Sequence, residues 1–165
     1  MLTPRYIFSG EYERLYSYFL TQPHRKKILQ KGEYLWKLGQ PREKIYYICS
    51  GIAVHYADHE NGRRKIISFH GTGTVFPGYH RNVYKIELSL VTQALSEMQV
   101  LEFTVAQFET MFEQNVELSK QVVDWYSMYI NRFLFETIHQ EYNPLLVKIS
   151  NLLYLLTTHT SDASQ

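Results

Sequence analysis

Residues 31–78 read KGEYLWKLGQPREKIYYICSGIAVHYADHENGRRKIISFHGTGTVFPG, a stretch in which short apolar runs alternate with glycine-containing turns. Residues 45–48 and 52–56 are rich in β-branched and aromatic residues, and a Ser-Gly pair separates them. Asn61-Gly62 precedes a third such run at 66–69. Asn-Gly between two such runs is the strongest short signal of a β-hairpin, because both residues tolerate positive φ. The stretch therefore predicts short strands joined by tight turns.

The same pattern continues on both sides of this stretch. Residues 75–79, 87–93 and 99–104 supply three further strand-like runs, and residues 9–20 have the apolar spacing of a short amphipathic helix. Turn signals roughly every ten residues are typical of an all-β sandwich or a barrel-like roll. We therefore expect a β-roll that follows one short helix.

A long helix is predicted after the strands. Thr104 and Gln107 form a capping box for a short helix at 105–112, and Asn115 caps a helix that runs to about Tyr142. One apolar stripe suffices to pack a helix onto a sheet, but this helix has two. We therefore expect a homodimer through the long helix; the alternative is that one monomer buries both stripes. The expected dimer seam is Leu118, Val122, Trp125 and Tyr129, and the second stripe is Val116, Val123, Ile130, Leu134 and Ile138.

The last part of the sequence predicts one more helix. Asn143 and Pro144 provide an N-cap and a first-turn proline, and the residues that follow, as far as Leu156, are strongly apolar. A helix of this composition requires a surface to pack against. We therefore expect the chain to be cut short within a longer protein.

Composition excludes several kinds of site. Seventeen basic and sixteen acidic residues leave a net charge of +1, so no whole-chain charge indicates nucleic acid or membrane. Cys49 is the single cysteine, which excludes an intrachain disulfide, a cysteine-based cluster and a zinc knuckle. There is no signal peptide and no apolar run of membrane length, so we expect a cytoplasmic protein without a membrane partner.

Five sequence pieces, taken in order and spacing, carry a family resemblance: Lys31-Gly32-Glu33, Gly39, Tyr46-Tyr47-Ile48-Cys49-Ser50-Gly51, Glu60-Asn61-Gly62-Arg63 and Gly73-Thr74-Val75-Phe76-Pro77-Gly78. With these pieces, residues from about 10 to 156 resemble the sensor half of the Crp/Fnr family of bacterial transcription regulators. The resemblance implies the cyclic-nucleotide-binding-domain fold. This is a mainly β fold with α: a double-stranded β-helix, or jelly-roll-like β-roll, flanked by a short N-terminal helix and a long C-terminal dimerisation helix.

The resemblance also implies a domain organisation and partners. The sensor roll is expected over residues 1–114 and the dimerisation helix over 115–142. Residues 143–165 are expected to be the hinge and first helix of a C-terminal DNA-binding domain, whose recognition helix lies outside this sequence. The implied partners are a second copy of the chain, a small-molecule effector, and DNA through that further domain.

Cyclic-nucleotide-binding members of the family hold the phosphate with a glycine turn and an arginine, and hold the ribose with a glutamate. Phe76-Pro77-Gly78 matches the turn, and Ser89 matches the hydroxyl residue after the arginine. The glutamate position, however, is Tyr79, and the arginine position is Leu88. A phosphate placed against Leu88 would lose its solvation without gaining a partner, at a cost on the order of several kcal/mol. Cyclic AMP and cyclic GMP are therefore not expected ligands.

An effector pocket between the roll and the long helix is still expected. Its aromatic wall suits a small aromatic or phenolic ligand. The tyrosine-rich helix and residues 141–144 are similar to the halorespiration regulators of this family, whose effectors are chlorinated phenols. Arg81 or Lys85 would supply a cation, unless both lie in a solvated loop; alternatively, the aromatic side chains fill a closed core and no ligand binds. The candidate effector-binding residues are Phe76, Pro77, Gly78, Tyr79, Tyr84, Lys85, Leu88, Ser89, Tyr126 and Tyr129.

Three other functions are possible alternatives for this sequence. Haem-based sensing requires an axial histidine near the turn, and His80 lies there, but in a polar loop that favours a surface role. A cupin-like metal enzyme requires a His-x-His pair, whereas His55 and His59 are four residues apart. We therefore predict no catalytic residue, no metal site, no cofactor and no enzymatic activity. The third reading is a sensor module that acts on a partner protein without DNA.

Overall fold

The computed structural model of the chain describes residues 3–161, with side chains described as far as residue 157. The strands in that range are β1 (Ile7–Phe8), β2 (Arg25–Leu29), β3 (Tyr34–Trp36), β4 (Lys44–Ser50), β5 (Ala53–Asp58), β6 (Arg64–His70), β7 (Val75–Phe76), β8 (Leu90–Ala94) and β9 (Met98–Thr104). The helices are the 3₁₀ helices η1 (Glu13–Leu15) and η2 (Lys85–Ser89) and the α-helices α1 (Tyr16–Thr21), α2 (Val105–Gln114), α3 (Val116–Tyr142) and α4 (Leu145–Ser161).

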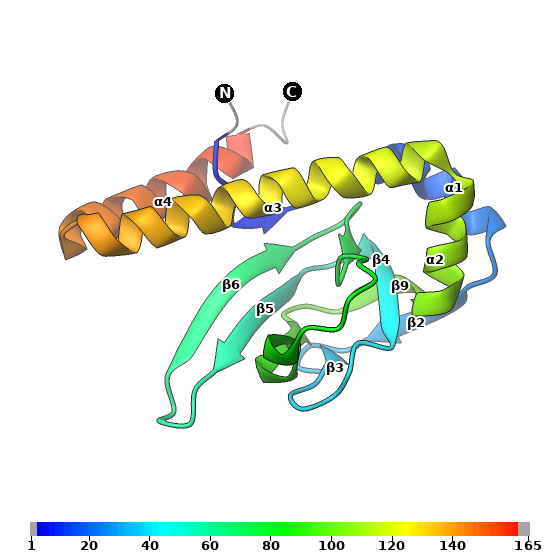
Figure 1. Cartoon of the computed structure of the whole chain (residues 1–165), viewed down its shortest axis with the longest axis horizontal. Helices are drawn as coiled ribbons and strands as arrows, with labels where there is room; N and C mark the ends of the chain where they lie inside the picture. The colour runs from blue at the N-terminus through cyan, green and yellow to red at the C-terminus, as the bar shows by residue number, and fades with distance from the viewer. Residues whose placement is uncertain (1–2, 162–165) are drawn as a thin grey trace.

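The strands form two sheets, and together they make the roll seen in Figure 1. One sheet has the order β1-β6-β5-β8-β3, and the other has the order β2-β9-β4-β7. Although β4 and β5 are neighbours in sequence, they belong to different sheets. The chain changes sheet at Gly51, which has a φ of +89° and where a Cβ would clash with the carbonyl oxygen of Glu97. Only glycine fits this corner.

Two strands in the middle of the roll are buried on both faces. Because side chains alternate along a strand, Ile45 and Tyr47 of β4 face the helices, where Phe19 and Trp125 also lie. Tyr46 of β4 points the other way, into a core between the two sheets. The roll therefore has an inner core of its own and a second core that the helices cover.

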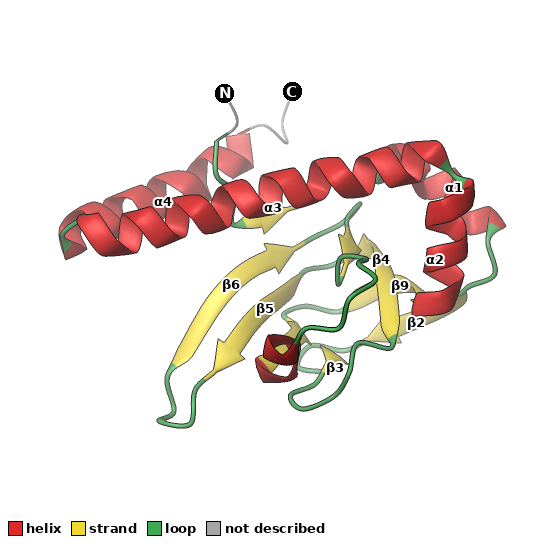
Figure 2. Cartoon of the chain, viewed as in Figure 1, coloured by secondary structure: helices red, strands yellow, loops and turns green. Residues whose placement is uncertain are grey.

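The helix α3 covers the open side of the roll. Figure 2 shows α3 and α4 along one side of the strands and α2 at one end of the roll, with α3 spanning the length of the roll. Leu118, Val122 and Trp125 are 0%, 4% and 1% exposed and belong to the same core cluster as the strands. These residues, with Tyr129, were the predicted dimer seam. Leu118, Val122 and Trp125 do not form that seam in this structure, because the chain buries them against its own roll, and Tyr129 is also partly buried there.

The helix α4 turns back and runs beside α3 (Figure 1). Its leucine-rich surface is only partly used: Leu155 is buried, whereas Leu145 and Leu146 are more than 70% exposed. The side-chain amide of Asn143 bonds to His139 Nδ1 at 2.9 Å and so ties the turn before α4 to the last turn of α3. Within residues 3–161 no helix is both long enough and apolar enough to cross a membrane.

The fold class predicted from the sequence is confirmed. The Asn61-Gly62 hairpin joins β5 and β6, with Gly62 at a φ of +78°. Two strand predictions were partly wrong: β7 ends at Phe76 rather than at residue 79, and residues 87–89 lie in η2, so that β8 begins at Leu90. Glu87 explains the second difference, because its carboxylate accepts the N–H of Tyr84 and caps the 3₁₀ turn. The short strands β1, β2 and β3 were not predicted.

The capping box predicted at the start of α2 is present, and it allows a test. The side chain of Thr104 accepts the N–H of Gln107 at 3.1 Å, and the side chain of Gln107 accepts the N–H of Thr104 at 2.8 Å. We expect Thr104→Ala to lower the free energy of unfolding by about 1 kcal/mol, measured by urea denaturation. As a control, Thr110→Ala removes a hydroxyl that bonds only within the helix. Equal losses in the two variants would contradict the capping role.

Candidate functional site

A cavity of about 420 Å³ lies between the roll and α3. This volume falls in the range of ordinary ligand pockets, roughly 300–1,000 Å³. The roll supplies one wall, and successive turns of α3 supply the other. The lining residues are Trp36, His55, Ile67, Phe76, Pro77, Gly78, His80, Tyr84, Ile86, Glu87 and Leu90 from the roll, and Trp125, Tyr126, Tyr129, Ile130 and Phe133 from α3.

The helix wall of this cavity is a continuous aromatic surface. The rings of Trp125 and Tyr129 are stacked, with centroids 4.7 Å apart, and Tyr126 stands edge-on to Trp125 at 5.1 Å. Phe133 stands edge-on to Tyr129 at 5.0 Å. Such rings offer apolar area in a fixed geometry, which suits a flat aromatic ligand more than a flexible polar one.

The structure brings together six of the ten candidate effector-binding residues: Phe76, Pro77, Gly78, Tyr84, Tyr126 and Tyr129 all line the cavity. The other four lie elsewhere. Tyr79 points into the helix-covered core, where its ring packs against Phe108 and Phe112. Lys85, Leu88 and Ser89 face solvent, because the turn of η2 directs only Ile86 and Glu87 toward the cavity. The part of the proposed alignment that used Tyr79 and Leu88 as ligand contacts is therefore corrected.

The loop after β7 already contains its own anion. Glu87 is 7% exposed, and its carboxylate pairs with His80 Nε2 at 2.7 Å. Arg42 donates to the carbonyl oxygens of Gly78 and His80 and so holds the same loop. A carboxylate at this place repels a phosphate group rather than attracting it. Contacts within the chain therefore hold this loop in place without a bound nucleotide.

Polar side chains gather on the roll side of the cavity. The Ser68 hydroxyl bonds to His70 Nε2 at 2.8 Å and lies 3.4 Å from the Tyr129 hydroxyl. His55 bonds to the Thr92 hydroxyl at 2.9 Å. Burial lowers the pKa of His55 to about 4 and also lowers the pKa of His70, so both imidazoles are neutral near pH 7.

A buried arginine lies beside the aromatic rings of the helix wall. Arg132 of α3 is 1% exposed, and its guanidinium carbon lies 4.3 Å from the ring centroid of Phe133 and 5.5 Å from that of Tyr129. Arg132 was not among the site residues predicted from the sequence. A signal was present, because Arg132 continues the 4-3-4 spacing of Leu118 to Tyr129 by one more step of three, which places a cation on the buried stripe.

The arrangement favours binding over catalysis. Among residues 3–161, no group of three His, Cys, Asp or Glu side chains is placed to hold a metal ion. The lone cysteine, Cys49, is half-buried, and burial raises the pKa of its thiol. What the cavity offers is apolar area, tyrosine hydroxyl groups, two imidazoles and the Glu87 carboxylate.

The comparison of sequences shows two matches. The family model of the cyclic nucleotide-binding domain matches residues 26–115, which is more than half of the chain. Electron transport regulator A of Shewanella oneidensis is 36% identical over 76 residues, which cover 42% of this chain and 30% of that protein. The matched part is thus less than a third of the curated relative.

Solved structures share the fold at low identity. CprK in complex with OCPA is similar with a TM-score of 0.73 and 13% identity, over 93% of this chain and 70% of that chain. FixK2 from Bradyrhizobium japonicum is similar with a TM-score of 0.66 and 17% identity, over 80% of this chain and 65% of that chain. The chain spans about two thirds of the length of these two proteins. At such identities the likeness establishes the fold.

Proposed function

We infer that this chain senses a small aromatic ligand rather than a cyclic nucleotide. The chain belongs to the family of the cyclic nucleotide-binding domain and has the predicted likeness to the Crp/Fnr regulators. The observation that carries this proposal is the aromatic cavity between the roll and α3. A phosphate would meet the Glu87 carboxylate in it, because Glu87 is buried and lines the cavity. An aromatic ring instead meets Trp125, Tyr126 and Tyr129.

A homodimer through α3 is part of the proposal, but through the second apolar stripe. Val116, Val123, Ile130, Leu134 and Ile138 are all between 54% and 68% exposed. They follow one face of the helix, opposite the face that packs on the roll. A monomer rarely leaves such a continuous apolar stripe in water, and the same stripe of a second copy is its simplest cover.

The proposed ligand cavity and the proposed dimer interface lie next to each other on α3. Ile130 and Phe133 line the cavity and are also 54% and 42% exposed on the side where the second copy would lie. A ligand that presses on these two side chains changes the surface offered to the partner helix. Differential contacts of this kind are what a ligand requires to shift a protein between two states.

We propose that the shift reaches DNA through residues that follow α3. The chain covers only 65% of FixK2 and matches only 30% of electron transport regulator A, and two residues separate α3 from α4. A change in the angle between α3 and α4 would move whatever domain α4 carries. Under this proposal the protein is a regulator and not an enzyme, and DNA recognition requires sequence beyond this chain.

A thermal-shift screen of the 165-residue chain tests the ligand class. The panel contains cyclic AMP, cyclic GMP, phenols, and aromatic acids with their amides. A ligand at one hundred times its dissociation constant adds about 2.7 kcal/mol, which raises the melting temperature by several degrees. We expect shifts with aromatic compounds and none with the nucleotides. A shift with cyclic AMP, or no shift with any aromatic compound, would contradict the proposal.

Two neighbouring positions on β6 locate the bound ligand. Ile67 lines the aromatic cavity, whereas Ile66 lines a different cavity on the other face of the strand. Ile67→Trp fills the aromatic cavity and should abolish the ligand-induced shift, and Ile66→Trp should leave it. The opposite result would place the ligand in the other cavity.

A further inference from the structure

A second cavity lies where α4 folds back against β6 of the roll and the end of α3. We call it the hinge cavity, because it lies next to the two residues that join α3 to α4. Its volume is about 320 Å³, at the lower end of the range of ordinary ligand pockets, roughly 300–1,000 Å³. It shares none of its described lining residues with the aromatic cavity, so the two are separate sites.

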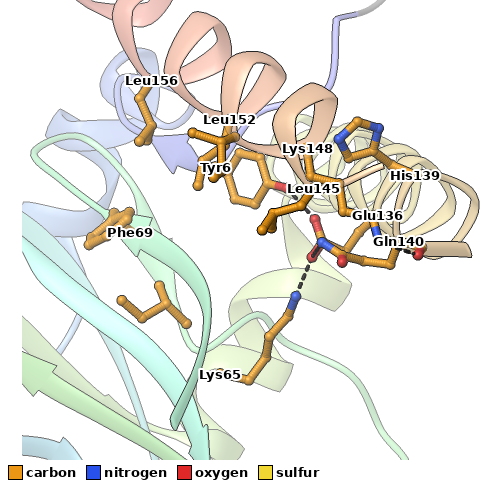
Figure 3. A pocket seen from close by; sticks show the side chains of 12 residues that line it. Tyr6, Lys65, Phe69, Glu136, His139, Gln140, Leu145, Lys148, Leu152 and Leu156 are labelled. Atoms are coloured by element: carbon orange, nitrogen blue, oxygen red, sulfur yellow. Dashed lines mark hydrogen bonds and ion pairs between the residues drawn. The ribbon is translucent and has the colours of Figure 1, made fainter. Parts of the chain in front are cut away.

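One end of the hinge cavity is an apolar, mainly aliphatic surface. Figure 3 shows Phe69 of β6 on one side of this end and Leu152 and Leu156 of α4 on the other. Part of the apolar lining remains in water, because Ile66, Ile149 and Leu152 are 45%, 47% and 41% exposed. A ligand with an aliphatic tail would cover this area, and the burial of apolar surface is favourable in proportion to the area removed from water.

The other end of the hinge cavity is polar. Figure 3 shows Glu136, His139 and Gln140 of α3 gathered there. The Glu136 carboxylate already has three donors, which are the Tyr6 hydroxyl, the Lys65 ammonium and the Gln140 side-chain amide. Because the Lys65 ammonium neutralises this carboxylate, Glu136 does not require a cation from a ligand.

Lys148 brings a further cation to the polar end. Its ammonium donates to the backbone carbonyl oxygen of Gln140 at 2.7 Å, and it has no carboxylate partner in the described part of the chain. An ammonium carries three N–H donors, so this contact leaves two of them for another acceptor. Lys148 is therefore a cation without an anion, at the rim of an apolar cavity.

His139 adds a buried donor at the same end. It is 5% exposed, and its Nδ1 accepts from the side-chain amide of Asn143 at 2.9 Å. The neutral imidazole therefore carries its proton on Nε2. This Nε2 is buried and has no hydrogen-bond partner among the described residues. A buried donor without an acceptor is costly, so an acceptor atom of a ligand would stabilise it.

We propose that the hinge cavity binds an aliphatic monocarboxylate of medium chain length. Its tail lies between Phe69 and the leucines of α4, and its carboxylate accepts from Lys148 and His139. A charge-assisted hydrogen bond of this kind is stronger than a neutral one. Since the ligand touches α4 and β6 at once, it stabilises the position in which α4 is docked on the roll. This site is independent of the aromatic cavity and of the ligand proposed for it.

Isothermal titration calorimetry of the 165-residue chain at pH 7.5 and constant ionic strength tests the ligand class. The ligands are octanoate, its neutral amide octanamide, and butyrate, which has the same head and a shorter tail. We expect octanoate to bind more tightly than either of the others by about tenfold or more. Between butyrate and octanoate, each added methylene group should tighten binding roughly threefold, because it is buried in the cavity.

Substitutions of Lys148 test the contact with the carboxylate. Lys148→Met should weaken octanoate binding by about 10- to 100-fold and leave octanamide binding unchanged. Lys148→Arg keeps the positive charge and should keep most of the affinity. Lys120→Met, at an exposed position of α3, is the matched control for the change in net charge and should bind octanoate as the wild type does.

Two further measurements locate the ligand. Ile66→Trp fills the hinge cavity and should abolish octanoate binding, whereas Ile67→Trp fills the aromatic cavity and should leave it. In the wild type, octanoate should slow the hydrogen exchange of the backbone amides of α4, because the ligand holds this helix on the roll.

Three results would overturn the inference. One is octanoate that binds no better than octanamide or butyrate, or does not bind at all, as expected if a peptide segment or a second copy covers the cavity. Another is Lys148→Met that binds octanoate as tightly as the wild type. The third is octanoate binding that Ile67→Trp removes and Ile66→Trp keeps. The proposed function is tested with aromatic ligands, so it stands or fails separately.

Discussion

Trp125→Ala is expected to lower the free energy of unfolding by about 3–5 kcal/mol. Trp125 is 1% exposed and lies where α3 meets the roll, with ring contacts to Phe8 at 5.7 Å and to Tyr129 at 4.7 Å. Alanine would leave a hole that its aromatic neighbours fill only in part. Because a domain of this size is stable by about 5–15 kcal/mol, the loss is a large fraction of the total. Urea denaturation followed by circular dichroism measures it.

The neighbouring residue provides the control for this substitution. Asp124 is exposed on the same turn of α3, and Asp124→Ala should change stability by no more than about 0.5 kcal/mol. A loss below about 1 kcal/mol for Trp125→Ala would mean that α3 is not packed on the roll as described. The aromatic wall of the cavity would then also be in doubt, since Trp125 is part of it.

The double substitution Val123→Asp with Ile130→Asp should convert the protein from a dimer to a monomer. Both side chains are more than half exposed in the single chain, so the fold of the protomer should survive. In the proposed dimer each carboxylate would be buried against an apolar stripe without a partner, which is strongly unfavourable. Light scattering should show the wild type at the dimer mass and the variant at the monomer mass of 19.6 kDa.

A control double substitution elsewhere on the surface distinguishes the loss of the α3 interface from a general effect of two added carboxylates. Ile28 on β2 and Val83 in the loop before η2 are 59% and 84% exposed. Ile28→Asp with Val83→Asp makes the same chemical change away from α3 and should leave the dimer intact. A wild-type chain that is monomeric at micromolar concentration would rule out the α3 dimer for this fragment.

The local turns and caps could be predicted from sequence because their causes are local. Gly62 specifies the hairpin turn through its positive φ, which Asn61 does not share, and Thr104 with Gln107 specifies a helix start through two hydrogen bonds three residues apart. Even so, Glu87 turned an expected strand into a 3₁₀ turn. Its partner His80 lies seven residues away across a loop, and the spacing gave no sign of the pair.

The site was only partly predictable. Phe76, Pro77 and Gly78 were identified by their place in a family pattern, and Tyr126 and Tyr129 by their place on the helix. Tyr79 was misplaced, because the pattern does not show on which side of the loop a side chain emerges. Arg132 was missed because a charged residue on a helix is usually exposed, although its spacing places it on the buried stripe of α3.

The sequence by itself determined the hairpins of the roll, the long helix that follows them and the existence of two apolar stripes on that helix, since these depend on periodicity and turn chemistry. Only the tertiary structure decided which stripe packs on the roll. Both stripes have helical spacing and apolar side chains, so their burial depends on the shape of the surface that each meets. The stripe that contains Trp125 and Arg132 packs on the roll, because the large rings on this face of α3 fill the open side of the roll. The stripe of Val123 and Ile130 stays exposed on the opposite face of α3.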